Sequence, residues 1–508
     1  MSPTQVCDRE RGWSTVPELK ASQLVTGVAK TKTKQFTVGA TAVGVAFAAL
    51  VAVATGPWDS SGQRKAEAHR AASREAGGGA DHGRTQAGAP SAAPSAPAVL
   101  AAPGASAPGP TKRALADVLD PLLGDASLGS RRTAAVVDAA TGKRLYGKSA
   151  GDALTPASTT KLATAVAALS AAGPDHRIAT RTVLEKGSGD SGELILVGGG
   201  DPTLTARPDK DNPYGAASLR TLADKTAKSL RADGIGEVTL SYDTSLYAGP
   251  SLHPIGVNDN LAQVTALMAD EARTDDSNKG PTPRAADPAA SAAQKFADLL
   301  KDRGIKTKGD PGPSKASGQA QDVAKVESPP LSALVERMLT NSDNDIAEAL
   351  ARQTAIAADE SHDFDGAGKA IKKELGKLGL PLGDAHFADG SGLDRTDKAS
   401  ADLLTSLLAK AADPAGPKLR SLLTGLPVAG FTGTLANRYE GDADASGTGL
   451  VRAKTGTLTG VNTLAGTVVD ADGRLLVFAF MTEGAPGPQT AQAGLDRLAS
   501  SVANCGCR

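Results

Sequence analysis

The chain is poor in cysteine, histidine and aromatic side chains for its 508 residues. Its three cysteines, Cys7, Cys505 and Cys507, lie near the two ends, so no disulfide framework is expected to hold the body of the fold. A local link between Cys505 and Cys507 is an alternative, but we expect a frayed tail. The six histidines are scattered without the spacing of metal ligands, which argues against a zinc peptidase.

An excess of charge of either sign is also absent, because 55 Lys and Arg face 56 Asp and Glu. Because there is no excess of positive charge, nothing in the composition indicates a nucleic-acid or other polyanionic partner. The length exceeds what one ordinary hydrophobic core accommodates, so we expect two or more packed units.

One long uncharged and largely apolar run is present, from Phe36 to Ala54, and three lysines precede it. It is long enough to span a bilayer, and the lysines favour a cytoplasmic N-terminal segment over residues 1–35. The end of the run, residues 52–54, also resembles a signal-peptidase site. The leader is long for a cleaved signal, so we favour an uncleaved anchor. In both cases the remainder is extracytoplasmic, held at the membrane or secreted into the cell wall.

Residues 55–112 are rich in Ala, Gly, Pro and Ser and have few large apolar side chains. Such a stretch does not bury enough surface to offset its ordering entropy, so we expect a disordered tether. The folded part is predicted to begin near residue 113. From about residue 182 the sequence changes to short apolar stretches, turn residues and a polar, Pro-rich segment. This change predicts an inserted unit over 182–329 between two catalytic segments, 113–181 and 330–508.

Hydrophobic periodicity and turn residues predict the elements of the folded part. A helix is expected over Ala114–Leu123, then a hairpin of Ala134–Asp138 and Leu145–Lys148, then a helix from Ser158 to Ala172. The other expected elements are strands at Glu193–Val197 and Glu237–Ser241, helical stretches at Leu331–Leu350 and Leu403–Leu423, a hairpin of Val461–Val469 and Leu475–Met481, and a helix at Thr490–Val502.

Ser158 and Lys161 form a Ser-x-x-Lys pattern at the start of a predicted helix. A spacing of three residues is about one helical turn, so both side chains face the same side. A lysine whose pKa is lowered by burial and nearby positive groups could take the proton of the serine. Backbone N–H groups at the helix N-terminus could stabilise an oxyanion. Taken alone, a helix start with a solvated lysine explains the pattern equally well.

A second pattern, Ser342-Asp343-Asn344, lies between two helical stretches. Its hydroxyl could relay a proton and its amide could hold a substrate carbonyl. An ordinary helix N-cap is the simpler interpretation of this tripeptide alone, because all three residue types favour that position.

A third pattern runs from Lys454 through Thr455 and Gly456 to Thr457, just before an apolar strand. A strand edge with a cation, hydroxyls and a glycine could bind an extended peptide and its terminal carboxylate, with Gly456 allowing close approach. A surface charge beside a turn glycine explains this pattern alone equally well.

The three patterns together are far more specific than any one of them. Class A β-lactamases and penicillin-binding proteins carry this set in this order. Three further stretches, Gly198–Leu204, Asp389–Leu393 and Gly433–Leu435, sharpen the match. From about residue 113 to the last helix, the chain resembles the class C low-molecular-mass penicillin-binding proteins, the D-Ala-D-Ala carboxypeptidase/endopeptidase family. The insertion is short for members with two extra subdomains, and Asp394 stands where a small polar residue is usual.

The resemblance implies an α/β (α+β) fold of the serine β-lactamase/transpeptidase type. Its antiparallel five-stranded sheet would carry helices on both faces and would be interrupted by an inserted mixed domain. No metal or organic cofactor would be needed. The implied partners are peptidoglycan stem peptides, with β-lactams as covalent inhibitors and the membrane contacted through the N-terminal segment.

The resemblance also implies roles for the residues of the three patterns. Ser158 would attack the D-Ala-D-Ala bond, with Lys161 as its base and Ser342 as a proton relay. Backbone N–H groups of Ser158 and Thr457 would form the oxyanion hole. The substrate would be held by Asn344, Lys454, Thr455, Gly456 and Thr457.

Other functions on the same site stay open at this point. A transpeptidase would pass the acyl group to an amine. A β-lactamase would need a residue that positions water for fast deacylation, and no Glu-x-x-Leu-Asn element is found for that role. A non-catalytic wall or β-lactam sensor is disfavoured because every expected catalytic side chain is present.

Overall fold

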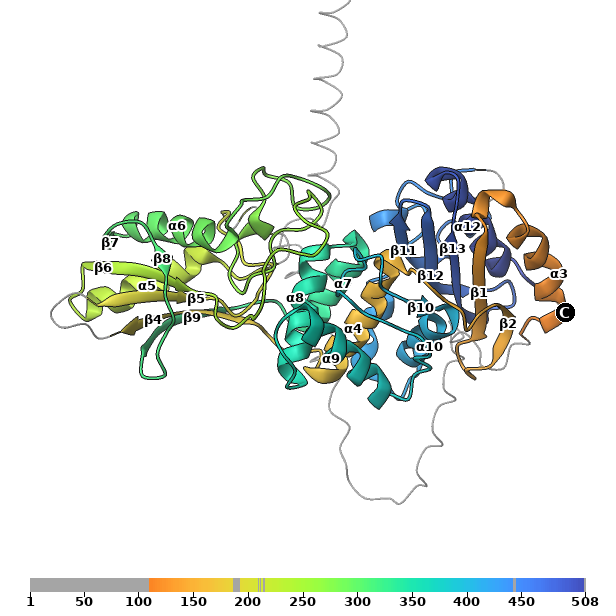
Figure 1. The fold of residues 1–508 in the computed structure, drawn as a ribbon, viewed down its shortest axis with the longest axis horizontal. Helices are drawn as coiled ribbons and strands as arrows, with labels where there is room; N and C mark the ends of the chain where they lie inside the picture. The colour runs from red at the N-terminus through yellow and green to blue at the C-terminus, as the bar shows by residue number, and fades with distance from the viewer. Residues whose placement is uncertain are drawn as a thin grey trace, which may run out of the picture. The chain divides into compact units, whose positions relative to one another are not determined.

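The computed structural model describes residues 109–185, 192–208, 210, 212, 215–441 and 445–506, and two β-sheets organise them (Figure 1). The expected anchor, nearly all of the expected tether, Cys7 and Cys507 lie outside these residues. Among the helices that the structure describes, none combines the length and the apolar character needed to cross a membrane.

The first sheet has five strands in the order β11-β12-β13-β1-β2, and all neighbours are antiparallel. This sheet confirms the expected architecture, including both predicted hairpins. Its strands are β1 (Arg131–Asp138), β2 (Arg144–Lys148), β11 (Arg452–Leu458), β12 (Val461–Val469) and β13 (Leu475–Glu483).

Helices cover both faces of this sheet, and the strand sequences reflect it. In β13, Phe478 packs in the core with α3 (Lys112–Leu123) and α12 (Pro488–Ala503), while Val477 and Ala479 pack in the core on the opposite face. Successive side chains of a strand point to opposite faces. Because both faces are covered, the strand appears in the sequence as a continuous apolar run rather than as an alternating one.

The opposite face is packed by a bundle around α4 (Thr160–Ala171), which follows the short 3₁₀ turn η2 (Ala157–Thr159). Helix α4 is rich in alanine and buried on nearly every side, so neighbouring helices approach it closely. Its neighbours are α7 (Leu331–Asn341), α8 (Asn344–Ala357), α9 (Phe364–Lys377) and α10 (Ala401–Ala412).

Two expectations of the sequence need correction here. The helical stretch expected over 403–423 ends at Ala412, because Pro414 and Pro417 follow, and it resumes only as η5 (Pro417–Leu419) and α11 (Ser421–Thr424). The tail is not frayed at Cys505, which is 3% exposed, packs in the core beside α12 and takes part in a disulfide.

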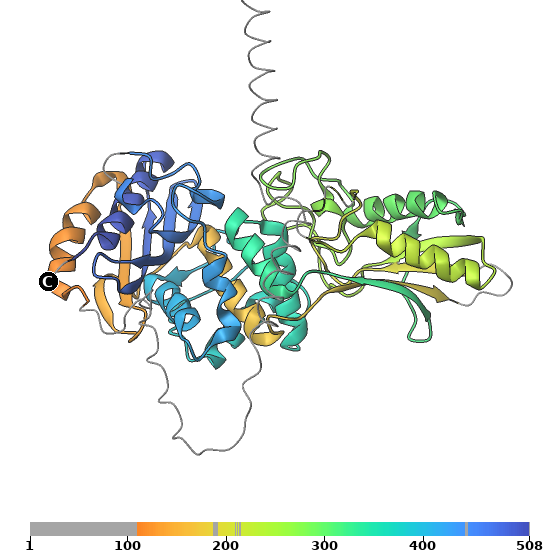
Figure 2. The same cartoon turned by 180° about the vertical axis from the view of Figure 1, so that it is seen from behind.

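The second sheet is mixed and begins at Ala179, slightly before the expected start of the insertion at residue 182. Its six strands follow the order β7-β6-β5-β4-β9, with β8 also paired to β6. Two helices, α5 (Leu219–Ala232) and α6 (Pro288–Lys301), lie side by side along it (Figures 1 and 2). The strands are β4 (Ala179–Glu185), β5 (Glu193–Val197), β6 (Glu237–Asp243), β7 (Lys306–Thr307), β8 (Gly312–Pro313) and β9 (Gln321–Glu327).

Short elements complete the described fold. They are the paired strands β3 (Ala153–Leu154) and β10 (Ala399–Ser400), and the 3₁₀ turns η1 (Ala126–Leu128), η4 (Asp270–Ala272), η6 (Gly433–Leu435) and η7 (Ala445–Gly447).

Candidate active site

The turn that carries Ser158 is held tightly on both sides. Ala157 has a positive φ of 47°, an unusual conformation for a residue with a side chain. The carbonyl of Pro156 accepts hydrogen bonds from Thr159 Oγ1 at 2.7 Å and from Thr463 Oγ1 on β12 at 2.8 Å. The turn therefore joins α4 to the sheet and fixes the serine at the start of the helix.

Lys161 lies one turn along α4 and is completely buried. Its Nζ donates to Ser158 Oγ at 3.2 Å, to Asn344 Oδ1 at 2.7 Å and to the Ser391 carbonyl at 2.6 Å. Burial lowers the pKa of Lys161 to about 8, although nearby carboxylates, first among them Asp389, act in the opposite direction. A substantial share of this amine is therefore unprotonated at mildly alkaline pH, as a general base requires.

Ser342 and Asp343 join α7 to α8. Ser342 ends α7 in the left-handed conformation, with φ 57° and ψ 41°. Asp343 is the N-cap of α8, and its Oδ1 accepts a hydrogen bond from the Ile346 N–H at 3.0 Å. The capping interpretation of this tripeptide is thus correct for Asp343, and the same cap presents Ser342 to Lys454 and Asn344 to Lys161.

Lys454 on β11 is the second buried amine of the site, with no exposed surface. Its Nζ donates to Ser342 Oγ at 2.9 Å and to the Thr455 carbonyl at 2.8 Å. Burial, and then the positive charge of Lys161, hold the pKa of Lys454 well below its usual value. Farther along the strand, Thr457 Oγ1 is exposed and accepts a hydrogen bond from Gln492.

The stretch Gly433–Leu435 lies beside the same strand. Thr455 Oγ1 donates to Thr434 Oγ1 at 2.8 Å. The two hydroxyls form one polar edge, so the sequence resemblance in this stretch corresponds to a contact in the site.

Gly456 is needed because a side chain at this position would collide with neighbouring residues of the protein, not because a bound peptide needs the space. A Cβ at this position would collide with Thr463 Oγ1 and lie 2.7 Å from the Pro156 carbonyl oxygen and 3.1 Å from the Ser158 nitrogen. The missing side chain therefore lets β11 lie directly against the turn that carries Ser158.

The stretch Asp389–Leu393 holds Lys161 through the Ser391 carbonyl. Asp389 accepts hydrogen bonds from backbone N–H groups of this loop, including Gly392 at 2.5 Å, and Glu348 on α8 accepts from Ser391 N–H at 2.8 Å. His253, from the insertion, lies 3.1 Å from Asp389 Oδ2. Sequence reasoning missed Glu348 and His253.

A histidine and two acids close together resemble a metal site, and atoms of His253, Glu348 and Asp389 lie within 4.8 Å of one another. The two acids are already engaged by backbone N–H groups, and His253 Nδ1 accepts from the Ile255 N–H at 3.2 Å. Burial lowers the pKa of His253, but the Asp389 hydrogen bond and nearby carboxylates outweigh it and raise the pKa. His253, Glu348 and Asp389 therefore fix the conformation of the loop that holds Lys161.

These residues meet at a cleft of about 300 Å³. Motif residues and residues of the insertion both line it, so the insertion contributes to the site. Its lining includes Ser158, Asn260, Lys279, Arg284, Ser342, Asn344, Leu393 and Thr457.

A serine beside a buried lysine, a second serine–lysine pair and a five-stranded antiparallel sheet between helices define a serine enzyme of the penicillin-binding and β-lactamase class. The chain belongs to the D-Ala-D-Ala carboxypeptidase 3 (S13) family, whose model matches residues 115–279 and 273–502. The enzyme class predicted from the motifs, a serine-type D-Ala-D-Ala carboxypeptidase of peptidoglycan metabolism, is thereby confirmed.

Relatives of known name span most of the chain. Carboxypeptidase DacB of Mycolicibacterium smegmatis is 36% identical over 428 residues, which cover 82% of this chain and 90% of the relative. The D-alanyl-D-alanine carboxypeptidase of an Actinomadura species is 31% identical over 467 residues, 76% of this chain and 84% of the relative.

Solved structures show the same fold. Penicillin-binding protein 4 (dacB) of Haemophilus influenzae matches with a TM-score of 0.62 and 23% identity, over 75% of this chain and 97% of that one. A structure of the same protein complexed with a β-lactam matches with a TM-score of 0.59 and 25% identity, over 77% and 99%.

Proposed function

We propose that Ser158 forms an acyl-enzyme with the stem peptide. Its Oγ attacks the carbonyl carbon of the D-Ala-D-Ala bond while Lys161 Nζ takes the hydroxyl proton, and the C–N bond then breaks. Water hydrolyses the resulting ester and returns the serine to its free form. The observation that supports this most is the 3.2 Å contact between the serine hydroxyl and a buried amine whose pKa is lowered to about 8.

Ser342 is the proposed donor of the proton to the nitrogen of the departing D-alanine, and Asn344 orients the substrate backbone. The hydroxyls of Thr455 and Thr457 hold the terminal carboxylate. Lys454 assists through its charge and through Ser342, since its ammonium is buried beneath that hydroxyl. The oxyanion is proposed to lie against the backbone N–H groups of Ser158 and Thr457.

β-Lactams are proposed to acylate the same serine, since penicillin-binding protein 4 of H. influenzae has been solved with one bound. The insertion is proposed as a domain over 182–329 between catalytic segments 113–181 and 330–508. The second sheet, which starts at Ala179 and ends at Glu327, supports these limits. Residues 36–54 are proposed as the membrane anchor and 55–112 as the tether to the wall.

The experiment compares the full chain with Ser158→Ala, using a fluorescent penicillin and, separately, D-alanine release from a D-Ala-D-Ala stem peptide. Labelling and release are both expected, and both are lost in the variant. Ser229→Ala on α5 removes a hydroxyl from the second sheet's layer and is expected to retain both activities. Labelling that survives in Ser158→Ala would overturn the assignment of the nucleophile. Labelling without release would indicate a sensor.

A further inference from the structure

The insertion contacts the side-chain amide of Asn344. Asn344 Oδ1 accepts a hydrogen bond from Lys161 Nζ at 2.7 Å, and Asn344 Nδ2 donates to the main-chain carbonyl of Asn260 at 2.9 Å. If the amide were turned over, its NH2 group would face the Lys161 ammonium, which has no acceptor, and its oxygen would face a carbonyl oxygen. The Asn260 carbonyl therefore determines that the acceptor end of Asn344 faces Lys161.

The Asn260 carbonyl is held by hydrogen bonds on both sides of it along the chain. The preceding carbonyl, that of Asp259, accepts a hydrogen bond from the Thr282 N–H at 3.0 Å. Two residues after Asn260, the Ala262 N–H donates to Asp345 Oδ1 at 2.9 Å. This short segment of the insertion is thus attached to α8 at the second residue of that helix.

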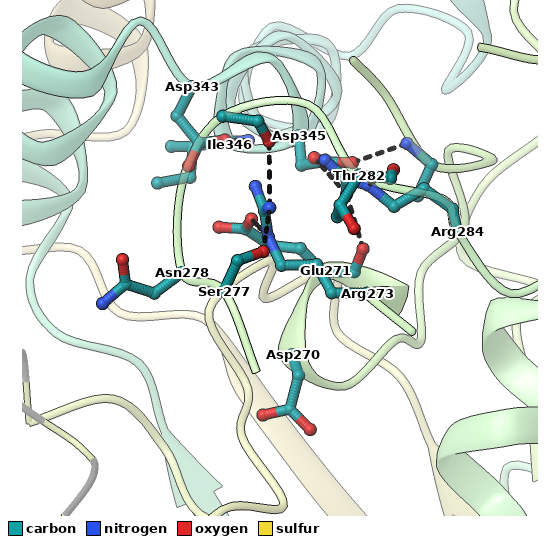
Figure 3. A network of polar contacts seen from close by, with 12 residues as sticks. Asp270, Glu271, Arg273, Ser277, Asn278, Thr282, Arg284, Asp343, Asp345 and Ile346 are labelled. Atoms are coloured by element: carbon teal, nitrogen blue, oxygen red, sulfur yellow. Dashed lines mark hydrogen bonds and ion pairs between the residues drawn. The ribbon is translucent and has the colours of Figure 1, made fainter. Parts of the chain in front are cut away.

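Arg284 holds the other oxygen of the Asp345 carboxylate, to which it donates a hydrogen bond at 2.7 Å (Figure 3). The same Arg284 nitrogen donates to the main-chain carbonyl of Glu271 at 2.6 Å, and both side chains of the ion pair are buried. Burial raises the pKa of Asp345 to about 6, while the Arg284 charge acts in the opposite direction. The arginine therefore helps to keep Asp345 charged, which strengthens its hydrogen bond to the insertion.

The backbone that carries Arg284 is itself constrained. An antiparallel bridge pairs Arg284 with Arg273, which comes directly after the turn η4. The three residues of this turn, Asp270 to Ala272, have φ values of 56°, 53° and 53°. Consecutive non-glycine residues in the left-handed region are strained, and such strain persists only where the surroundings enforce it. A fixed backbone thus presents the arginine to Asp345.

We propose that Arg284 and Asp345 are positioning residues for acylation: by holding the Asn260 carbonyl against α8, they orient the Asn344 amide and, through it, Lys161. The inference rests on the proposed function, since it concerns the amide and the amine that act there. Arg284 and Asp345 also line the cleft, so direct contact with the substrate is the alternative role, and the experiment separates the two.

The test uses the full chain and measures acylation by a fluorescent penicillin, together with kcat and KM for D-alanine release from a stem peptide. Arg284→Met keeps a side chain of similar length and removes its charge. We expect acylation and kcat to fall by about tenfold, and the loss in kcat to exceed any rise in KM, because a displaced amide misplaces the base. Arg284→Lys should restore most of the rate, since it returns a cation to Asp345.

A double-mutant cycle with Asn344→Ala tests the route of the effect. Because the ion pair is proposed to act through the Asn344 amide, adding Arg284→Met to Asn344→Ala should lower acylation by less than about twofold further. If Arg284→Met does not fold, Asp345→Asn takes its place in the same cycle, because it removes the ion pair with almost no change in volume. The same pattern is expected, with a smaller loss in the wild-type background.

Arg303→Met is the matched control, because it removes another arginine of the insertion, one that is paired with Asp224 on α5, and it should leave all three quantities unchanged. Wild-type rates in Arg284→Met would overturn the proposal. So would an equally large loss in the Asn344→Ala background, since the arginine would then act independently of the amide. A rise in KM with kcat unchanged would assign Arg284 to substrate binding and would also overturn it. If the wild-type chain shows neither labelling nor release, the proposed function itself is refuted.

Discussion

The two walls of the cleft differ in the ionisable groups that they bury and in the partners of those groups. On the wall formed by α4 and β11, the buried ionisable groups are amines, Lys161 and Lys454, and burial lowers the pKa of both. On the wall formed by the insertion and α8, they include acids that are paired with arginines, and burial raises the pKa of Glu271 to about 8 and that of Asp345 to about 6. The same physical cause thus favours the neutral form on both walls.

The hydrogen-bond partners of these groups differ. The difference distinguishes groups that can transfer a proton from groups that hold a loop in place. Lys161 and Lys454 contact hydroxyl, amide and carbonyl oxygens, so a proton can leave either amine without breaking an ion pair. Glu271 and Asp345 contact guanidinium groups, which keep their charge throughout the working pH range. The first wall is suited to proton transfer and the second to holding a loop in place.

Removing the amine of the first wall should have the largest effect. For Lys161→Ala we expect D-alanine release to fall by about 10³-fold or more, because Ser158 loses its proposed base and the site loses a central hydrogen-bond donor. Lys148→Ala, an exposed lysine of β2, is the control. A loss smaller than about tenfold would show that another group accepts the proton.

The pH dependence of acylation should report the lowered pKa of Lys161. Since the pKa of Lys161 is lowered to about 8, the unprotonated base becomes more abundant as pH rises toward that value. Penicillin acylation should therefore speed up by roughly 50-fold between pH 6 and pH 8 and then level off. Stopped-flow labelling measures this, and a rate that is flat over this range would contradict the assignment.

The contact between β11 and the turn that carries Ser158 can be tested with Gly456→Ala. The added methyl group has no space beside Thr463 and Pro156, so we expect a loss of about 1–3 kcal/mol in the free energy of unfolding. Urea denaturation measures the loss. Gly376→Ala in α9 is the control, because its Cβ would meet nothing closer than 3.7 Å, and it should stabilise the chain slightly.

A substitution at Glu271, on the second wall, should have the smallest effect, and we expect it to change the pH dependence of stability rather than activity. Because the pKa of Glu271 is raised above its unfolded value of 4.5 to about 8, the folded chain binds more protons than the unfolded one between these values. This contribution to stability is therefore lost as pH rises from about 5 to 8. Glutamine cannot titrate, so Glu271→Gln lacks that loss.

Relative to wild type, the free energy of unfolding of Glu271→Gln should gain about 1 kcal/mol or more from pH 5 to pH 8. Urea denaturation at the two pH values measures it. Glu237→Gln, in an exposed pair with Lys308, should show no such gain. If the free energy of unfolding of Glu271→Gln and that of wild type changed equally between the two pH values, Glu271 would not be a group that titrates in this range.

Much of the first wall was predictable because local patterns encode it. The hairpin of β12 and β13 follows from two apolar runs around a turn that ends at Gly473, and the Ser158–Lys161 spacing places both side chains on one helical face. The three motifs predicted the contact between the elements that carry them only through their resemblance to a family. Spacing alone left a simpler explanation for each.

The rest was not predictable from local patterns. Helix α9 was missed because Gly366 and Gly368 lie inside it, where they weaken a helical signal, although both are needed for close packing against carbonyl oxygens. His253 and Glu271 act through partners distant in sequence, so no spacing marks them. Glu348 did leave a signal, since it is the one acid in the otherwise small and apolar run Ile346–Ala351.

The pairing of β1 with β13 has a consequence for how the protein is made. Their register joins Arg131 to Glu483, so the sheet beside the Ser158 turn lacks its central strand until residue 483 has emerged. The second sheet is complete once β9 has emerged, far earlier in synthesis. Such long-range pairing is slow to form. Until β13 has been synthesised, Ser158 therefore lacks the assembled sheet against which its turn is fixed, so we expect no peptidase activity before that strand is made.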